Sequence, residues 1–188
     1  MPSVFSHAIV GWSAGKTFFI KKQPLRFWFL SIILPILPDL DVIMFFFGIP
    51  YEHFWGHRGF FHSILFSLLL TALTMALFYR QIKIFRKPWL VYFFYFFLIT
   101  ASHGLLDAFT SGGLGIALLA PFNNTRYFFP VTPVQVSPLG FKAFFSDWGL
   151  KVMVSELLWI WFPSIAFILV SMGIRRLWNK KRLFLYEK

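Results

Sequence analysis

The stretch 53-HFWGHRGFFHSILFSLLL-70 places two histidines and an arginine directly before a long apolar run. His57, Arg58 and His62 precede a segment that carries no charged residue before Arg80. An imidazole or guanidinium at the edge of a hydrocarbon environment loses its hydration unless another group satisfies it. The stretch therefore indicates a membrane helix whose entrance holds polar side chains that need partners.

The composition is that of an integral membrane protein. Of 188 residues, 58% are hydrophobic, 22% are aromatic and only 13% are charged, whereas soluble domains carry about 25% charged residues. No Ser/Gly-rich linker, low-complexity tract or internal repeat divides the sequence, so one domain over residues 1–188 is expected. The first 20 residues lack the basic start and the cleavage site of a secretory signal, so we expect them to be retained.

Apolar runs predict an all-α fold, a polytopic membrane helical bundle with four long spans. Each run approaches the roughly 20 residues that cross a bilayer as a helix, and the four runs cover residues 25–48, 59–79, 88–110 and 152–174. A short N-terminal helix over residues 4–20 precedes them. Pro35 and Pro38 should break the first span, so we expect irregular backbone at 38-PDLD-41.

The basic residues are grouped on one side of these spans. They concentrate in residues 21–26, 80–87 and 175–188. By the positive-inside rule these segments are cytoplasmic, which places the loops 48–58 and 111–150 outside. We therefore interpret the net charge of +11 as the topology signal of a multi-pass membrane protein, and we expect no direct nucleic-acid partner.

Acidic and imidazole side chains fall at one depth of the predicted bundle. At about 1.5 Å per helical residue, each lies about 20 to 28 Å from the basic cluster on its own helix. The residues at this distance are His7, Asp39, Asp41, His62, His103, Asp107 and Glu156, and His57 lies in the adjoining loop. The sequence therefore predicts that these residues converge at the outer-face ends of the helices, toward the periplasm or exterior.

Single members of this set also have structural explanations. His103 and Asp107 are four residues apart, so they share a helix face and can reach one ion, or the imidazole can simply bond to the carboxylate. Asp39 near a proline break can cap the next helical turn. A carboxylate at the membrane edge costs a few kcal/mol unless it is paired, which leaves Asp41 without such an explanation.

His57 and His62 of the opening stretch cannot share a helix face. His57 and His62 are five residues apart, which separates them by about 140° on a helix, so we expect His57 in the loop and His62 in the first turn. The alternative is an anchor in the membrane interface, which the aromatic Phe54 and Trp55 favour. We interpret His53 as such an anchor.

Together these side chains form the ligand set of a metal centre. Four imidazoles and three carboxylates suit two or more divalent ions, with zinc expected and manganese or iron as alternatives. The predicted ligands are His7, Asp39, Asp41, His57, His62, His103 and Asp107. The chain contains no cysteine, so any metal site must use nitrogen and oxygen.

Six pieces of the sequence match a known pattern: His7, 38-PDLD-41, 57-HRGFFHS-63, 102-SHGLLDAFTSGG-113, 128-FFPVTPVQVSPLG-140 and 155-SELLWIW-161. At these pieces the chain resembles the bacterial YdjM-type family of inner-membrane proteins described as metal-dependent hydrolases, one branch of which is described as LexA-binding. That family is distantly similar to zinc-dependent phospholipase C and single-strand nucleases. The resemblance implies phosphoester hydrolysis, and it implies metal ligation by His7, Asp39, His57, His62, His103 and Asp107, less securely by Asp41 and Glu156.

The expected function is metal-dependent hydrolysis of a phosphoester in a membrane lipid or at the membrane surface, by metal-activated water. Asp41 or Glu156 is the expected general base. Arg58 and Arg126 are candidates to grip phosphate oxygens, because a guanidinium matches them bidentately. Their alternative is an anchor to lipid headgroups.

Two other classes of function remain open at this point. An ion or proton transporter also uses intramembrane acids and histidines, although the inner halves of these helices are nearly unbroken apolar runs. A non-catalytic scaffold would bind a cytoplasmic regulator through the basic segments. The long loop 111–149 either forms a lid over the site or seals the helix ends.

Overall fold

A computed structural model describes residues 1–138 and 141–186, with side chains described except at residue 141 and residues 179–186. Within this part the chain is helical and forms no β-strand, which confirms the all-α prediction. The elements are α1 (Val4–Phe18), α2 (Leu25–Ile33), η1 (Leu37–Phe47), η2 (Phe60–His62), α3 (Ile64–Phe78), α4 (Lys87–Ala108), α5 (Phe141–Phe144), α6 (Asp147–Glu156), η3 (Leu157–Trp161) and α7 (Phe162–Tyr186).

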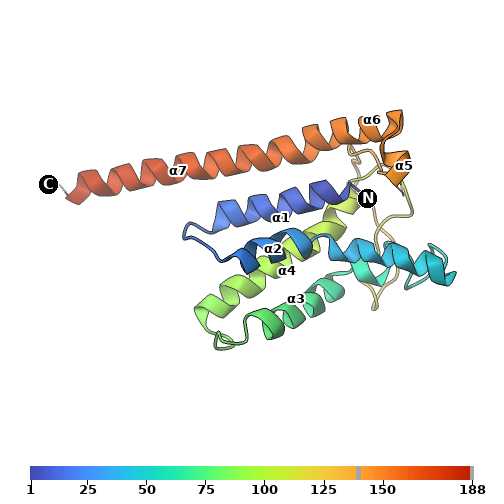
Figure 1. Ribbon diagram of the computed structural model, residues 1–188, viewed down its shortest axis with the longest axis horizontal. Coiled ribbons are helices and arrows are strands. Elements are labelled where there is room, and N and C mark those ends of the chain that lie inside the picture. Colours follow the sequence, from blue (N-terminus) through green and yellow to red (C-terminus); the bar gives the residue numbers. More distant parts are fainter. Residues whose placement is uncertain (139–140, 187–188) are drawn as a thin grey trace.

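The successive passes of the chain run in alternating directions along one bundle (Figure 1). Helix α1 packs against α2 and α7, and α3 packs against α4. Helices α6, η3 and α7 continue one another as a long helix that extends beyond the rest. We call the end where α1 and α6 begin and α4 ends the site end; the basic connections lie at the opposite end, as the sequence predicts.

Two helices are long and apolar enough to cross a membrane. They are α4, with 22 residues, and the continuous helix Asp147–Trp178, with 32 residues. Helices α2 and η1 supply a third span only if the bent pair counts as one. The prediction of four long spans is therefore not confirmed. Its second span forms α3, whose 15 residues cover about 22 Å, less than the roughly 30 Å of a hydrocarbon core.

The bend between α2 and η1 lies at the two prolines. Helix α2 ends at Ile33, and η1 begins at Leu37 with its axis turned by 48°. Proline has no N–H and its ring collides with the preceding turn, so the α-helix cannot continue. The break was predicted correctly, but 38-PDLD-41 is not irregular: it forms the start of an 11-residue 3₁₀-helix that ends at Gly48 with φ 72°.

An aromatic core fills the half of the bundle away from the site end. Its buried members are Phe27, Leu30, Leu34, Met75, Tyr79, Tyr95, Phe96 and Ile99. Among the residues that the structure describes, every Asp, Glu and His lies at the site end. The core therefore separates the acidic and imidazole groups from the basic end.

Candidate metal centre

Helix α4 contributes His103 and Asp107, and the broken helix beside it orients the imidazole. The Asp39 N–H donates to Ile36 O at 3.1 Å, three residues back as in a 3₁₀-helix, which leaves the Pro35 carbonyl free. His103 Nδ1 bonds to that carbonyl at 2.8 Å. A protonated Nδ1 leaves the lone pair on Nε2, which lies 3.4 Å from Asp39 Oδ1.

His62 stands in the turn just before α3. The Ser63 hydroxyl accepts from Phe66 N at 3.0 Å and caps α3, so the helix begins at Ile64 and His62 belongs to the 3₁₀ turn η2. Its Nδ1 lies 3.1 Å from Asp41 Oδ2. Its Nε2 lies 3.5 Å from Asp39 Oδ1 and 3.5 Å from Asp107 Oδ2. The ring thus faces carboxylates on both sides.

His7 enters from α1 and completes the inner side of the cluster. Its Nε2 lies 3.3 Å from Asp107 Oδ1 and 3.9 Å from Asp39 Oδ2. The ring stacks on His103 with 4.0 Å between centroids and is fully buried. His7 is thus brought to the same carboxylates from a helix that is remote in sequence.

The structure brings the seven predicted ligands together in one buried His–Asp cluster: His7, Asp39, Asp41, His57, His62, His103 and Asp107. Two groups within it have ligand atoms that all lie within 4.8 Å of one another. The first is Asp39, His62, His103 and Asp107; the second is Asp41, His57 and His62. As predicted, His57 comes from the loop, and its Nδ1 bonds to Asp41 Oδ1 at 2.6 Å.

The cluster contains buried polar atoms without hydrogen-bond partners. They are both ring nitrogens of His7 and His62, Nε2 of His103, and both carboxylate oxygens of Asp39 and Asp107. Each such atom costs about 1–3 kcal/mol when it is left unsatisfied, and more where it is charged. Imidazole nitrogens and carboxylate oxygens that converge in this way, with Arg58 Nε 3.3 Å from one of them, Asp107 Oδ2, are the donor set of a divalent ion such as zinc. The residues therefore fit a metal.

Arg58 is buried in the wall of the cluster. Its backbone has a left-handed φ of 65°, and its N–H donates to Asp41 Oδ2 at 3.0 Å. The guanidinium donates to Thr110 Oγ1 at 2.8 Å and to Gly112 O at 2.6 Å, and its Nε lies 3.3 Å from Asp107 Oδ2. With 1% of its surface exposed, Arg58 lies in the wall of the cluster, and its expected contact with phosphate or headgroups stays a prediction.

Arg126 holds the loop that carries His57. It donates to the carbonyls of His57 and Tyr51, both at 3.0 Å, and its guanidinium lies over the Tyr51 ring at 5.5 Å. Partial burial lowers the pKa of Arg126, while Tyr51 and Glu52 act in the opposite direction. Burial likewise raises the pKa of the Tyr51 hydroxyl. Arg126 thus clamps the loop from outside the cluster, and its expected phosphate contact stays a prediction.

Glu156 belongs to neither ligand group. It accepts from the backbone N–H of Ser3, from the Ser3 hydroxyl at 2.5 Å and from the Ser6 hydroxyl at 2.6 Å. Trp161, in the π-helical segment η3, donates to the same Ser6 hydroxyl at 2.8 Å. Glu156 therefore ties the start of α1 to the end of α6, and its predicted role as a base has no support from this placement.

The loop before α5 is bonded through the backbone to the chain around the start of α3. Ala117 N donates to Arg58 O at 3.1 Å, and Ile64 N donates to Leu118 O at 3.0 Å. Both bonds fix the loop at the entrance of α3. In this part the loop seals the helix ends.

His53 lies outside the cluster. It is exposed, and its Nδ1 accepts from Trp55 N at 3.2 Å. This position agrees with the interpretation that His53 does not serve as a ligand.

Comparison with known proteins gives the family. The family model of the YdjM inner membrane proteins matches residues 1–179. The chain belongs to the YdjM inner membrane protein family. It is also 35% identical over 182 residues to the Inner membrane protein YbcI of Escherichia coli (strain K12), which covers 97% of this chain and 100% of the relative. No solved structure matches.

Membership of the YdjM family agrees with the apolar helices. The names of the family and of the E. coli relative state an inner membrane protein, and two to three helices here can span a membrane. The predicted inner-membrane location is therefore confirmed. Neither name states a metal or an activity, so those rest on the His–Asp cluster.

One glycine of this YdjM-family chain controls the position of His62. A Cβ on Gly104 in α4 would lie 2.6 Å from the His62 carbonyl oxygen. Gly104→Ala should therefore push η2 away from α4, lowering the free energy of unfolding by about 1–3 kcal/mol and weakening metal binding. Denaturant unfolding in detergent, with and without added zinc, measures both effects.

The matched control is Gly173→Ala in α7, where an added Cβ meets nothing within 4 Å. This variant should unfold like the wild type or slightly later, because alanine is the better helix former by about 1 kcal/mol. Equal behaviour of the two alanine variants would contradict a close packing requirement at Gly104.

Proposed function

We propose that this protein is a membrane-embedded, metal-dependent hydrolase that cleaves phosphoesters at the site end of the bundle. One observation carries the proposal: unpaired nitrogens and oxygens of His7, Asp39, His62, His103 and Asp107 converge in a buried space. These nitrogens and oxygens face one another at 3.3–3.9 Å without hydrogen-bond geometry, and an ion between them would satisfy them. Nitrogen and oxygen atoms placed in this way can coordinate a divalent ion, and such an ion can activate water for hydrolysis.

The charge of the cluster supports a single divalent ion. Asp39, Asp41 and Asp107 are buried beside the buried cation Arg58, and the ammonium group of Met1 acts on Asp107 as a second positive charge. The three carboxylates still outnumber these cations when the imidazoles are neutral, and uncompensated buried charge is strongly destabilising. One divalent ion compensates the excess, whereas two would leave a larger positive excess.

The two ligand groups then have different roles. Asp39, His62, His103 and Asp107 would hold the ion, with His7 beside them. Asp41 is already bonded to His57 and to Arg58 N, and it lies against His62 Nδ1. It therefore orients His62, as carboxylates commonly do for ligating imidazoles. The earlier expectation of two or more ions becomes a competing prediction. Zinc is the expected ion, with manganese or iron as alternatives.

The chemistry follows from these positions. A bound divalent ion supplies Lewis acidity and lowers the pKa of a coordinated water. Hydrolysis adds the water oxygen to phosphorus, breaks the P–O bond to the alcohol and moves one proton to the departing oxygen. Asp39 is the carboxylate best placed to carry that proton, because both its oxygens lack hydrogen-bond partners, whereas Asp107 faces Arg58 Nε and Asp41 and Glu156 already accept from several donors.

The two alternative classes of function, a transporter and a scaffold, make different demands on the structure. A transporter needs polar groups along the whole path, but the aromatic core closes the bundle between the cluster and the basic end. A scaffold for a cytoplasmic regulator would not need the cluster to bind metal. Metal content and hydrolysis therefore separate the hydrolase from the scaffold.

The test uses the full chain, purified in detergent, stripped with a chelator and reloaded with zinc, manganese or iron(II). We expect one ion per chain and metal-dependent hydrolysis of at least one of a panel of phospholipids and soluble phosphodiesters. Asp39→Asn should retain the fold and lose hydrolysis, and His53→Ala should change neither. Absence of bound metal would refute the metal centre; bound metal without hydrolysis across the panel would refute the enzyme and leave the scaffold.

A further inference from the structure

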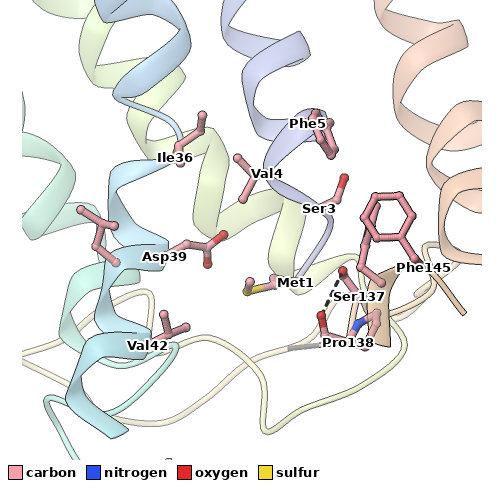
Figure 2. A pocket seen from close by; sticks show the side chains of 12 residues that line it. Met1, Ser3, Val4, Phe5, Ile36, Asp39, Val42, Ser137, Pro138 and Phe145 are labelled. Atoms are coloured by element: carbon pink, nitrogen blue, oxygen red, sulfur yellow. Dashed lines mark hydrogen bonds between the residues drawn. The ribbon is translucent and has the colours of Figure 1, made fainter. Parts of the chain in front are cut away.

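An apolar cleft leads from the side of the bundle to the His–Asp cluster. It has a volume of about 470 Å³ and lies between the start of α1, the 3₁₀-helix η1 and the chain around α5 (Figure 2). The volume falls within the roughly 300–1,000 Å³ of ligand sites. Its walls are mostly apolar and include Val4, Phe5, Ile36, Val42 and Phe144.

Asp39, one of the predicted metal ligands, forms the inner end of the cleft. The Asp39 side chain points from η1 into the space between η1 and α1 (Figure 2). Asp39 is only 6% exposed, and neither of its carboxylate oxygens has a hydrogen-bond partner. With an ion held at Asp39 as proposed above, the apolar cleft would suit a ligand that is apolar along its length and anionic at one end.

The mouth of the cleft is apolar as well. Phe5 is 58% exposed, Leu40 is 53% exposed and Phe145 is 71% exposed. In a protein with membrane-spanning helices, such side chains face hydrocarbon at no cost, whereas water would penalise them. The cleft therefore opens toward lipid.

Two other apolar grooves lack this connection. The groove between α1 and α4, lined by Val10, Val91 and Ser102 among others, contains no residue of the cluster. The groove between η1 and α3 reaches Asp41, whose oxygens accept from His57 and from Arg58 N. Of the three, the cleft at Asp39 is the one that ends on unpaired ligand atoms.

We propose that this cleft binds one hydrocarbon chain of a lipid phosphoester and places its ester group at Asp39. The proposal rests on the proposed function and names its substrate class: a lipid that enters sideways from the bilayer, with the chain between α1 and η1. Val4 and Val42 line the chain site from opposite walls.

The experiment tests binding separately from hydrolysis. The probe is a phosphatidylglycerol with a photoreactive diazirine on one acyl chain, placed with the full-length protein in lipid nanodiscs, and the labelled residues are found by mass spectrometry. Val4→Trp and Val42→Trp each narrow the cleft. The matched control is Val91→Trp, because Val91 lines the separate apolar groove between α1 and α4.

We expect labelling near Phe5, Leu40 and Phe144 that falls about tenfold in both cleft variants, equivalent to about 1.4 kcal/mol, and stays unchanged in Val91→Trp. In parallel, hydrolysis of the long-chain lipid should fall by a similar factor, while hydrolysis of soluble bis(p-nitrophenyl) phosphate and bound metal stay within twofold of wild type.

The outcomes separate the two proposals. Labelling equally spread over cleft and groove, or unchanged in both cleft variants, overturns the chain site. Labelling confined to the cleft without any hydrolysis supports the chain site while the proposed function fails. Hydrolysis that is equally slowed for the soluble diester and the lipid overturns the chain site and leaves the hydrolase standing.

Discussion

Replacing His62 by alanine is expected to abolish tight metal binding, because His62 is the residue that both ligand groups share. Its Nε2 lies 3.5 Å from both Asp39 and Asp107, and its Nδ1 lies 3.1 Å from Asp41 Oδ2. Losing a ligand should cost more than the roughly 10- to 100-fold that losing an outer partner costs. Metal per chain after gel filtration in detergent, together with zinc titration, measures the effect.

Two variants make this result interpretable. His53→Ala removes an exposed imidazole outside both groups and should leave the affinity unchanged. Asp41→Asn should weaken binding by roughly 10- to 100-fold if Asp41 orients His62. If instead a second ion sits at Asp41 and His57, the same change halves the metal content. Wild-type affinity in His62→Ala would refute the site.

Replacing Arg58 by methionine is expected to lower the stability of the metal-free protein by about 3–5 kcal/mol, the cost of breaking a buried ion pair. Methionine keeps much of the apolar volume but removes the charge facing Asp107 and the donors to Thr110 and Gly112. The remaining carboxylates then repel one another without a fixed counter-charge. Denaturant unfolding followed by tryptophan fluorescence, after chelator treatment, measures the loss.

Zinc should restore part of this stability, since an ion supplies positive charge at the same carboxylates. The control is Lys151→Met, because Lys151 is an exposed cation on α6, and its loss should change the free energy of unfolding by less than about 0.5 kcal/mol. If metal-free Arg58→Met unfolds like Lys151→Met, then Arg58 is not the counter-charge of the cluster.

The sequence was sufficient to place the ligands at one depth, and the reason is geometric. Helical rise is regular, so counting from the basic clusters locates His7, His103 and Asp107 at a common level. The membrane also makes unpaired carboxylates costly, which singled out Asp39 and Asp41. These inferences need only the distance along each helix.

The contacts that hold the ligands could not be predicted this way. His103 can bond to the Pro35 carbonyl because the Asp39 N–H donates to Ile36 O and leaves that carbonyl free. Whether a backbone N–H bonds three or four residues back is decided locally and is not visible in the sequence. Glu156 accepts a hydrogen bond from Ser3, which is 153 residues away in the sequence, and a single sequence gives no signal for such a pair.

Arg58 shows the same limit, since its guanidinium could have faced solvent or protein. The length of α3 was missed for a different reason. The apolar run from residue 59 includes a 3₁₀ turn and the capping Ser63, so fewer residues are available for the α-helix.

The shortness of α3 has a consequence for the surrounding bilayer. Its exposed leucines, Leu68, Leu69, Leu73 and Leu77, face hydrocarbon along only about 22 Å, so lipids beside it meet a hydrophobic mismatch. A bilayer adapts to a short apolar surface by thinning, at fractions of a kcal/mol per Å. Thinning draws headgroups inward at the helix entrance where His62 stands. If the His–Asp cluster acts on a lipid as proposed, the acyl-chain length of the host membrane should therefore change the position of lipid esters relative to the cluster.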